Sequence, residues 1–325
     1  MGSDYRASYD QSEVQGVPEV IGERPLHNSV GIELVGLDLD KDRTVEIVRT
    51  AVHRHACVLL RAQDLLPQQL RDISRKLGLP LPPYRPQYSL DGYPEIVQVG
   101  NLCIDGHVKT YLNRGGVEWH TDSPGSSHPP GYSILYCLQS KIPDGGGETG
   151  FVSTVSGYQS VPDELKAKIS NVQVVHSFNT FNDRVSDYSE STVPGQEGAL
   201  RERNKDTLDS IVQTHPVTGE LHLYVSHAMV KDVPGLEADK SKDLIMSLVA
   251  LATSEEKIYK HVWVPGDLIV LDNRICLHTP FPYAFDDYPR TRRLLHQIIV
   301  ENKTTAEEIM KKVNFKNFTS VAKIS

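Results

Sequence analysis

Cysteine is scarce in this chain, and its four cysteines stand far apart. Cys57, Cys103, Cys137 and Cys276 form no CxxC pair, the spacing typical of structural zinc sites and redox dithiols. We therefore expect reduced and mostly buried thiols. Stability must then come from a hydrophobic core, and 325 residues are enough to bury a sizeable one.

Other features are missing, and each absence excludes a class of partner. No apolar run approaches the roughly 18 residues that a membrane-spanning helix needs. Residues 1–14 contain no apolar segment of the kind found in secretory signals, and Arg6 stands where a myristoylation signal requires Ser or Thr. The formal net charge of -8 provides no general attraction for nucleic acid or anionic lipid. We expect a cytoplasmic protein without nucleic-acid or membrane partners.

The chain shows no internal repeat, no low-complexity tract and no convincing domain boundary. Its hydrophobic content of 39% and charged content of 23% are ordinary for a soluble globular protein. Residues 1–20 are polar and predict a flexible N-terminal tail, which leaves residues 21–325 as a single domain. The sequence is also compatible with a homo-oligomer.

Hydrophobic periodicity predicts a fold that is mostly β with flanking helices. Apolar residues recur at helical spacing in residues 44–56, 66–78 and 241–253. Short apolar strands separated by turn residues fill most of residues 132–300. That rhythm is typical of an antiparallel β sandwich or barrel.

Two segments interrupt this pattern, and we interpret them as lids. Residues near 82–118 are rich in loops apart from one credible strand at 95–101, and residues near 178–210 form a long polar excursion. Long irregular segments inside a compact domain commonly cover a binding site. Residues 306–313 predict a short terminal helix.

The segment GVEWHTDSPG, residues 116–125, places His120 and Asp122 one residue apart. In a strand, residues i and i+2 point to the same face, so both side chains can reach one point. A redox-active iron needs neutral imidazole, a charged oxygen ligand, a third protein ligand and vacant positions for substrate and oxygen. The H-x-D pair supplies two of these ligands.

The third ligand should be a distant histidine on a neighbouring strand, and His278 has the best surroundings. It follows a predicted turn and a buried strand in WVPGDLIVLDNRICLHTP, and Arg293 comes shortly afterwards. A buried guanidinium beside a metal can hold a dicarboxylate cosubstrate through two parallel hydrogen bonds. Arg292 competes for this role, because neighbouring residues on a strand face opposite sides.

Several motifs, in this order, carry a family resemblance: WHTD, GGGET, WVPGDLIVLDNR, LH and RTRRLLHQ. Over roughly residues 25–300 the chain resembles the TauD/TfdA group of Fe(II)- and 2-oxoglutarate-dependent dioxygenases. The resemblance implies a cupin-like double-stranded β-helix of the jelly-roll type. It also implies Fe(II) as cofactor, with 2-oxoglutarate and O2 as cosubstrates.

The resemblance assigns roles to particular residues. His120, Asp122 and His278 match the family's two-histidine, one-carboxylate iron ligands. Arg293 matches the arginine that pairs with the distal carboxylate of 2-oxoglutarate, and the spacing in RRLLHQ favours it over Arg292. Thr149, in GGGET, matches the threonine that hydrogen-bonds the same carboxylate.

The implied reaction oxidises a C–H bond of a small molecule, by hydroxylation or by desaturation or cyclisation, and releases succinate and CO2. In the taurine enzyme of the family, an arginine four residues after the cosubstrate arginine helps to anchor the sulfonate. Gln297 stands at that position here, so taurine is not the expected substrate. Our substrate-binding candidates are Tyr111, Asn113, Arg114 and Gln297.

Two alternatives remain open at this point. An H-x-D pair with a distant histidine can also bind zinc in a hydrolase, which leaves Arg293 and Thr149 without a purpose. A non-catalytic jelly-roll binding or sensor protein is the second alternative, and an intact set of ligands argues against it. We expect His215 to be structural, and Asp272 and Asn273 to close a turn.

Overall fold

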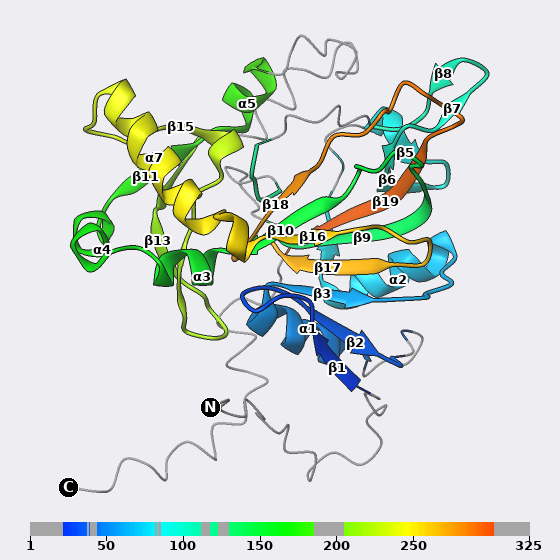
Figure 1. Ribbon diagram of the computed structural model, residues 1–325, viewed down its shortest axis with the longest axis horizontal. Coiled ribbons are helices and arrows are strands. Elements are labelled where there is room, and N and C mark those ends of the chain that lie inside the picture. Colours follow the sequence, from blue (N-terminus) through cyan, green and yellow to red (C-terminus); the bar gives the residue numbers. More distant parts are fainter. Residues whose placement is uncertain are drawn as a thin grey trace, which may run out of the picture.

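The computed structural model describes residues 22–37, 39, 44–81, 83, 86–111, 118–122, 130–184 and 205–301. Within these residues, a large sheet forms the centre of the molecule (Figure 1). Its strands, in spatial order, are β1 (Gly22–Pro25), β2 (Ile32–Val35), β3 (Cys57–Leu60), β17 (Leu268–Asp272), β9 (Pro130–Lys141), β19 (Arg292–Glu301), β6 (Tyr93–Gly100) and β5 (Ser89–Leu90), and β4 (Leu79–Pro80) pairs with β19. The central pairs β3–β17–β9–β19–β6 are all antiparallel.

Both faces of this sheet are buried, and alternate residues of each central strand face opposite ways. In β9, Tyr132 and Ile134 belong to the hydrophobic core on one face, whereas Leu135 and Cys137 belong to the core on the other. The central strands are therefore apolar almost throughout. Such strands are expected where a sheet is covered on both sides.

Helices α1 (Thr44–His55) and α2 (Pro67–Leu77) cover the first face. In α2, Leu70, Ile73 and Leu77 are buried at helical spacing. Pro67 occupies the first turn, where the missing N–H costs nothing. The helix ends at Gly78, where a Cβ would stand 2.2 Å from the carbonyl oxygen of Glu301, so only glycine allows this close approach to β19.

A smaller antiparallel sheet covers the second face. It contains β16 (Tyr259–His261), β10 (Thr149–Ser153) and β18 (Cys276–Pro280), with β10 in the middle. Phe151, Cys276 and Trp263 pack with Leu135 and other residues of the large sheet in one core. The candidate site lies at this pair of facing sheets, because β10 and β18 carry Thr149 and His278.

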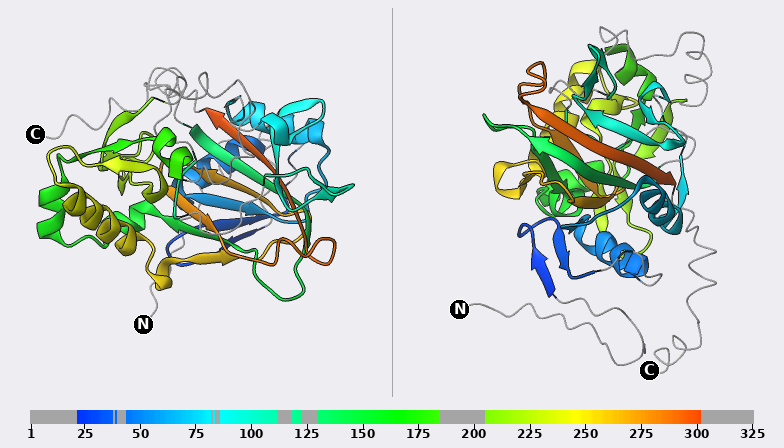
Figure 2. Two further views of the ribbon diagram at one scale, coloured as in Figure 1. Left: turned by 90° about the horizontal axis from the view of Figure 1, so that it is seen from above. Right: turned by 90° about the vertical axis from the view of Figure 1, so that its right-hand side faces the viewer.

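A third group of elements has its own hydrophobic cluster and stands beside the two sheets (Figures 1 and 2). Its helices are α3 (Thr154–Gln159), α4 (Asp163–Ile169) and α7 (Ala238–Ala252), and its strands are β11 (Gln173–His176), β12 (Thr207–Ser210), β13 (Val212–Thr214), β14 (Leu221–Leu223) and β15 (Val230–Asp232). In the part of the chain that the structure describes, the other elements are α5 (Phe178–Arg184), β7 (Cys103–Ile104), β8 (His107–Val108) and the short 3-10 turns η1 (Pro86–Tyr88), η3 (His227–Met229) and η4 (Glu255–Lys257).

The expected architecture, mostly β with flanking helices, is confirmed. The helices expected at 44–56, 66–78 and 241–253 are α1, α2 and α7. The short helices α3 and α4 were not expected, because six and seven residues are too few to show a helical period. In the described residues, no helix is both long and apolar enough to cross a membrane.

Several expectations fall on parts of the chain outside the described residues. These are the N-terminal tail, the terminal helix at 306–313 and much of the second expected lid. Most of the first expected lid is described. The strand expected at 95–101 is present there as β6, and this segment is less loop-rich than expected, because it also contains β5, β7 and β8. Of the second lid, α5 and β12 are described.

Candidate active site

His120 and His278 are brought together by their backbones. The two residues form an isolated antiparallel β-bridge, with His278 N–H donating to His120 O at 2.8 Å and His120 N–H donating to His278 O at 3.1 Å. Residues directly opposite in such a bridge project their side chains to the same side. Their ring centroids are 4.3 Å apart.

Asp122 completes the group. The Nε2 atoms of His120 and His278 lie 3.9 Å and 3.8 Å from the same carboxylate oxygen, Asp122 Oδ1. Two ligand atoms that each lie about 2.1 Å from one metal ion are at most about 4.2 Å apart. Both distances therefore fit a shared ion, and a neutral-imidazole and carboxylate donor set suits Fe(II). We call these three residues the triad.

Asp122 reaches the triad differently from our expectation. We predicted a strand that carries His120 and Asp122 on one face, but only His120 takes part in a β-bridge, and Asp122 stands at a bend. The backbone N–H of Asp122 donates to the side chain of Asn273 at 3.2 Å instead of pairing with a neighbouring strand. The side chain of Asn273 therefore orients the backbone of Asp122, in place of the strand pairing that we expected.

The second carboxylate oxygen of Asp122 is held by side chains. Ser133 Oγ and Gln297 Nε2, the latter at 3.2 Å, both donate to Asp122 Oδ2. Asn273 Nδ2 in turn donates to Ser133 Oγ at 2.7 Å. These bonds occupy Oδ2 and leave Oδ1 facing the two imidazoles. Outer contacts of this kind orient metal ligands and tune their affinity.

The orientation of the His120 ring and the charge of the His278 ring also suit metal binding. His120 Nδ1 donates to the carbonyl oxygen of Glu118 at 2.9 Å, so Nε2 is the ring nitrogen that faces Asp122. Burial, followed by the nearby His120, lowers the pKa of His278 to about 4. The ring of His278 is therefore neutral at neutral pH, and this is the form that binds a metal.

Arg293 points into the same cavity as the triad. It is 5% exposed, and its Nε donates to the carbonyl oxygen of Gly147 at 3.2 Å while Nη2 donates to Thr149 Oγ1 at 3.4 Å. Burial lowers the pKa of its guanidinium. Arg292 faces outward, where its Nε donates to Pro289 O. Of the two adjacent arginines, only Arg293 can reach a ligand in the cavity.

The cavity wall combines these polar groups with apolar side chains. Arg293, Leu295 and Gln297 line it from alternate positions of β19, as a period of two predicts. The complete set of described lining residues is Val99, Tyr111, His120, Asp122, Leu135, Thr149, His278, Pro280, Arg293, Leu295 and Gln297. Arg293 is the only permanent cation among them.

Of the four substrate-binding candidates, Tyr111 and Gln297 line the cavity, whereas Asn113 and Arg114 lie outside the described residues. The role of Gln297 in substrate binding stays a prediction, since its amide also bonds Asp122. Sequence reasoning missed Ser133. Its signal was a lone polar residue at an inward position of the apolar strand YSILYCL, in register with Leu135.

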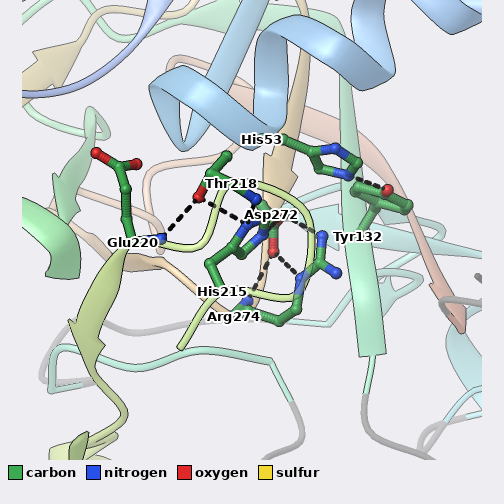
Figure 3. Close-up of polar contacts among 7 residues, drawn as sticks. All are labelled: His53, Tyr132, His215, Thr218, Glu220, Asp272 and Arg274. Atoms are coloured by element: carbon green, nitrogen blue, oxygen red, sulfur yellow. Dashed lines mark hydrogen bonds and ion pairs between the residues drawn. The ribbon is translucent and has the colours of Figure 1, made fainter. Parts of the chain in front are cut away.

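A buried charge cluster stands beside the site (Figure 3). It comprises His53, Tyr132, His215, Asp272 and Arg274. Asp272 is fully buried, and Arg274 bonds both of its carboxylate oxygens while His215 Nε2 lies 3.1 Å from one of them. Burial alone would raise the pKa of Asp272, but Arg274 and His215 hold it well below its usual range. His215 is thus structural, as expected.

The charge cluster is connected to the triad by the turn that follows Asp272. Asp272 also accepts the backbone N–H of Arg274 at 2.9 Å, which closes the turn after β17. Asn273 lies within this turn and contacts both Asp122 and Ser133. The expectation that Asp272 and Asn273 close a turn was right for Asp272, and the side chain of Asn273 has the additional contact with a triad residue.

Buried histidines predict a pH-dependent stability. Burial lowers the pKa of His53, His222 and His296 from 6.5 to about 4. Between these values the unfolded chain binds protons that the folded chain does not, so the free energy of unfolding falls as pH decreases from 6.5 to 4. Each group contributes about 1.4 kcal/mol per pH unit in this window.

We expect the urea midpoint of the metal-free protein to fall steadily between pH 7 and pH 5. The variant His296→Gln should show a shallower decline, whereas His107→Gln, at an exposed position on β8, should retain the full slope. A urea midpoint that is independent of pH in this range would contradict the lowered pKa values of the buried histidines.

Comparison with known families agrees with this geometry. A family model described as "Taurine catabolism dioxygenase TauD, TfdA family" matches residues 22–298, which is most of the chain. The chain is 29% identical over 287 residues to an "Alpha-ketoglutarate-dependent sulfate ester dioxygenase" of Pseudomonas putida, covering 84% of this chain and 87% of that protein. It is 30% identical over 210 residues to "Pentalenolactone F synthase" of Streptomyces arenae, covering 63% and 68%.

A solved structure is similar as well. The crystal structure of a taurine dioxygenase from Burkholderia xenovorans superposes with a TM-score of 0.69 at 26% identity, and it covers 87% of this chain and 90% of that one. Fold, site and family match together define a metal-dependent dioxygenase. The chain belongs to the TauD/TfdA family, whose members use Fe(II), O2 and 2-oxoglutarate, and these are its cofactor and cosubstrates.

Proposed function

We propose that His120, Asp122 and His278 bind Fe(II), and that Arg293 and Thr149 bind the distal carboxylate of 2-oxoglutarate. The enzyme then couples decarboxylation of 2-oxoglutarate to oxidation of a C–H bond in a small-molecule metabolite. In the hydroxylation branch, O2, 2-oxoglutarate and the C–H substrate give the alcohol, succinate and CO2. In the desaturation or cyclisation branch, the substrate loses two hydrogen atoms, and the products are the desaturated or cyclised compound, water, succinate and CO2.

One observation carries this proposal: among the described residues, no carboxylate pairs with the buried guanidinium of Arg293. The guanidinium donates to the carbonyl oxygen of Gly147 and the hydroxyl of Thr149, and it lies over the ring of Tyr283, 6.0 Å from the ring centroid. A buried charge is costly unless it is paired. A carboxylate from a ligand in the cavity supplies that pair, and a dicarboxylate can also reach the triad.

The protein residues orient the reactants, and iron supplies the activation of oxygen when it is bound. Ser133 and Gln297 hold the carboxylate of Asp122 so that one oxygen faces the ion. Asn273 supports this arrangement through the backbone N–H of Asp122 and the hydroxyl of Ser133. The apolar side chains of Val99, Leu135 and Leu295 exclude water from the cavity. Arg293 and Thr149 keep the cosubstrate at a fixed distance from the triad.

The substrate we propose is a metabolite without a strongly acidic group near Gln297. The position that is an arginine in the taurine enzyme carries a neutral amide here, and that amide is already bonded to Asp122. We therefore propose that taurine is not the substrate. Tyr111, with Asn113 and Arg114 two and three residues later in the sequence, remains our candidate for substrate contact.

The remaining parts of the proposal concern architecture and location. The antiparallel central strands of the large sheet and the smaller antiparallel sheet that faces them support a jelly-roll, cupin-like double-stranded β-helix within a single domain of residues 21–325. We further propose that segments near 82–118 and 178–210 act as lids, that residues 1–20 form a flexible tail, and that the enzyme works in the cytoplasm, alone or as a homo-oligomer.

Anaerobic addition of Fe(II) and 2-oxoglutarate tests the assignment. We expect a visible charge-transfer band from the chelated ferrous complex, and succinate release once oxygen and a substrate are added. A folded, iron-loaded sample without this band would contradict the proposal. The zinc-dependent hydrolase and the non-catalytic binding protein would then be the remaining alternatives. Screening metabolites for faster succinate release then identifies the substrate.

Arg293→Ala provides the matching variant. Removing a buried charge-assisted pair costs about 2–5 kcal/mol, so the concentration of 2-oxoglutarate that half-saturates the band should rise by about 30-fold or more. Arg292→Ala is the matched control, because it removes an adjacent but outward-facing arginine, and its saturation curve should not move. The reverse outcome would show that the inward arginine was assigned wrongly.

A further inference from the structure

The WVPGD turn contributes a residue that touches the proposed cosubstrate site without lining the cavity. Trp263 is 3% exposed and packs in the core between the two sheets. Its indole Nε1 donates a hydrogen bond to Thr149 Oγ1 at 2.9 Å. Trp263 is therefore placed directly behind a residue that the proposed function assigns to 2-oxoglutarate.

The hydrogen-bond inventory of Thr149 determines which way its hydroxyl points. A threonine hydroxyl has one hydrogen to donate and two lone pairs that accept. Trp263 Nε1 and Arg293 Nη2, at 2.9 Å and 3.4 Å, both approach Thr149 Oγ1, and both groups can only donate. The two lone pairs are thus occupied, and none of the described residues accepts the hydroxyl hydrogen.

We propose that Trp263 is a positioning residue that fixes the Thr149 hydroxyl as a hydrogen-bond donor to the cavity, and so makes the cosubstrate site selective for a carboxylate. This rests on the proposed function. A carboxylate only accepts hydrogen bonds, so it suits a donor hydroxyl. A distal amide has one accepting oxygen and one NH2 group. If its oxygen accepts from Thr149 or from Arg293, its NH2 faces the other donor, and the amide also loses the charge pair with Arg293.

Neighbouring residues hold Trp263 in this orientation. His261, the direct cross-strand partner of Thr149, packs edge-on against the indole, with ring centroids 4.6 Å apart and an interplanar angle of 88°. The Nδ1 atom of His261 is 2.8 Å from the Tyr259 hydroxyl, and its Nε2 atom is 3.1 Å from Asp267 Oδ2.

The turn itself is closed by Asp267. Its Oδ2 accepts the backbone N–H of Val264 at 3.0 Å, and Arg61 Nη1 donates to both of its carboxylate oxygens at 3.0 and 3.1 Å. These contacts connect the residues around Trp263 to one another. Their shared effect is to fix the indole N–H against Thr149.

Equilibrium binding to the Mn(II)-loaded protein without oxygen tests the proposal independently of catalysis. Titration calorimetry should give a dissociation constant for 2-oxoglutarate that rises about threefold to tenfold in Trp263→Phe, the range expected for one lost hydrogen bond. The preference for 2-oxoglutarate over 2-oxoglutaramate, in which the distal carboxylate is an amide, should fall by about threefold or more.

A double-mutant cycle separates orientation from packing. If Trp263 acts through the hydroxyl, then Trp263→Phe has no further effect on 2-oxoglutarate binding in a Thr149→Val background. Tyr136→Phe is the control, because it removes a hydroxyl that bonds Leu65 and Gln63 on the opposite face of the large sheet from Leu135, and its 2-oxoglutarate binding should be unchanged. The proposal would be overturned if Trp263→Phe weakened binding equally in the wild-type and Thr149→Val backgrounds, and did so for both 2-oxoglutarate and 2-oxoglutaramate.

A spectroscopic measurement decides the case if Trp263→Phe does not fold. The chain has two tryptophans, Trp119 and Trp263, so the Zn(II)-loaded, 15N-labelled protein shows two indole N–H signals. We expect the Trp263 signal to move when 2-oxoglutarate is added and to be insensitive in Thr149→Val. A signal that ignores 2-oxoglutarate in a protein that binds it refutes the role of Trp263 alone, whereas no binding by the wild-type protein refutes the proposed function itself.

Discussion

His120→Ala should lose Fe(II) binding and bring succinate release to background. The variant removes one of two imidazoles that share Asp122 Oδ1, at 3.9 Å and 3.8 Å, and it leaves a single histidine and a carboxylate to hold the ion. Altering a residue that hydrogen-bonds a metal ligand typically lowers metal affinity by about 10–100-fold. Loss of a direct ligand should exceed this range, and we expect a weakening of more than about 100-fold, measured by equilibrium dialysis with Fe(II) or Mn(II).

The backbone bridge between residues 120 and 278 does not depend on the imidazole of His120, so the variant should keep its fold. Its urea midpoint at neutral pH is the check. His107→Ala, at an exposed histidine on β8, is the matched control and should bind metal like the wild-type protein. Undiminished metal affinity in folded His120→Ala would remove the triad from the proposal.

Arg274→Met should be the most destabilising of the changes proposed here. Arg274 bonds both carboxylate oxygens of the fully buried Asp272, and its removal leaves a carboxylate whose remaining side-chain partner is His215. Breaking a buried pair in this way costs about 3–5 kcal/mol, because the partner charge stays in an apolar environment. Urea unfolding of the metal-free protein at pH 7 measures the loss.

Metal affinity should fall along with stability in Arg274→Met. The turn that Asp272 closes carries Asn273, which bonds the backbone of Asp122 at 3.2 Å. The double variant Asp272→Asn/Arg274→Met should be more stable than Arg274→Met, since it removes the unpaired charge as well. Arg290→Met is the control, because Arg290 forms exposed ion pairs with Asp287 and Asp144, and its midpoint should not change. A loss below about 1 kcal/mol in Arg274→Met would contradict the role of the cluster.

Much of the fold could be predicted because many of its helices and strands have a recognisable hydrophobic pattern in the local sequence. The helical period in residues 44–56 and 66–78 arises from one buried face, and the apolar runs of β3, β9 and β17 arise from burial on both faces. The short helices α3 and α4 carry no such period. Helix α3 begins where β10 ends, at Ser153, whose Oγ accepts the N–H of Ser156, and α4 begins after Pro162 without a side-chain cap.

The candidate site was predictable to the extent that its motifs lie in short segments. His120 and Asp122 are two residues apart, and Arg293 follows His278 at a spacing that matches the family. The partners of Asp122 could not be predicted in this way. Ser133, Asn273 and Gln297 come from three different strands or turns, and no local pattern relates them.

By itself, the sequence determined the class of fold, and it indicated the candidate metal ligands and a pair of arginines, Arg292 and Arg293, that could hold a dicarboxylate. Hydrophobic periodicity and short motifs carry these signals. Only the tertiary structure decided which of two adjacent arginines turns inward, which oxygen of Asp122 faces the imidazoles, and which neighbour occupies the lone pairs of Thr149. These outcomes depend on the register between strands that are far apart along the chain. That register is set by how the two sheets bury their shared core, and local propensity does not encode it.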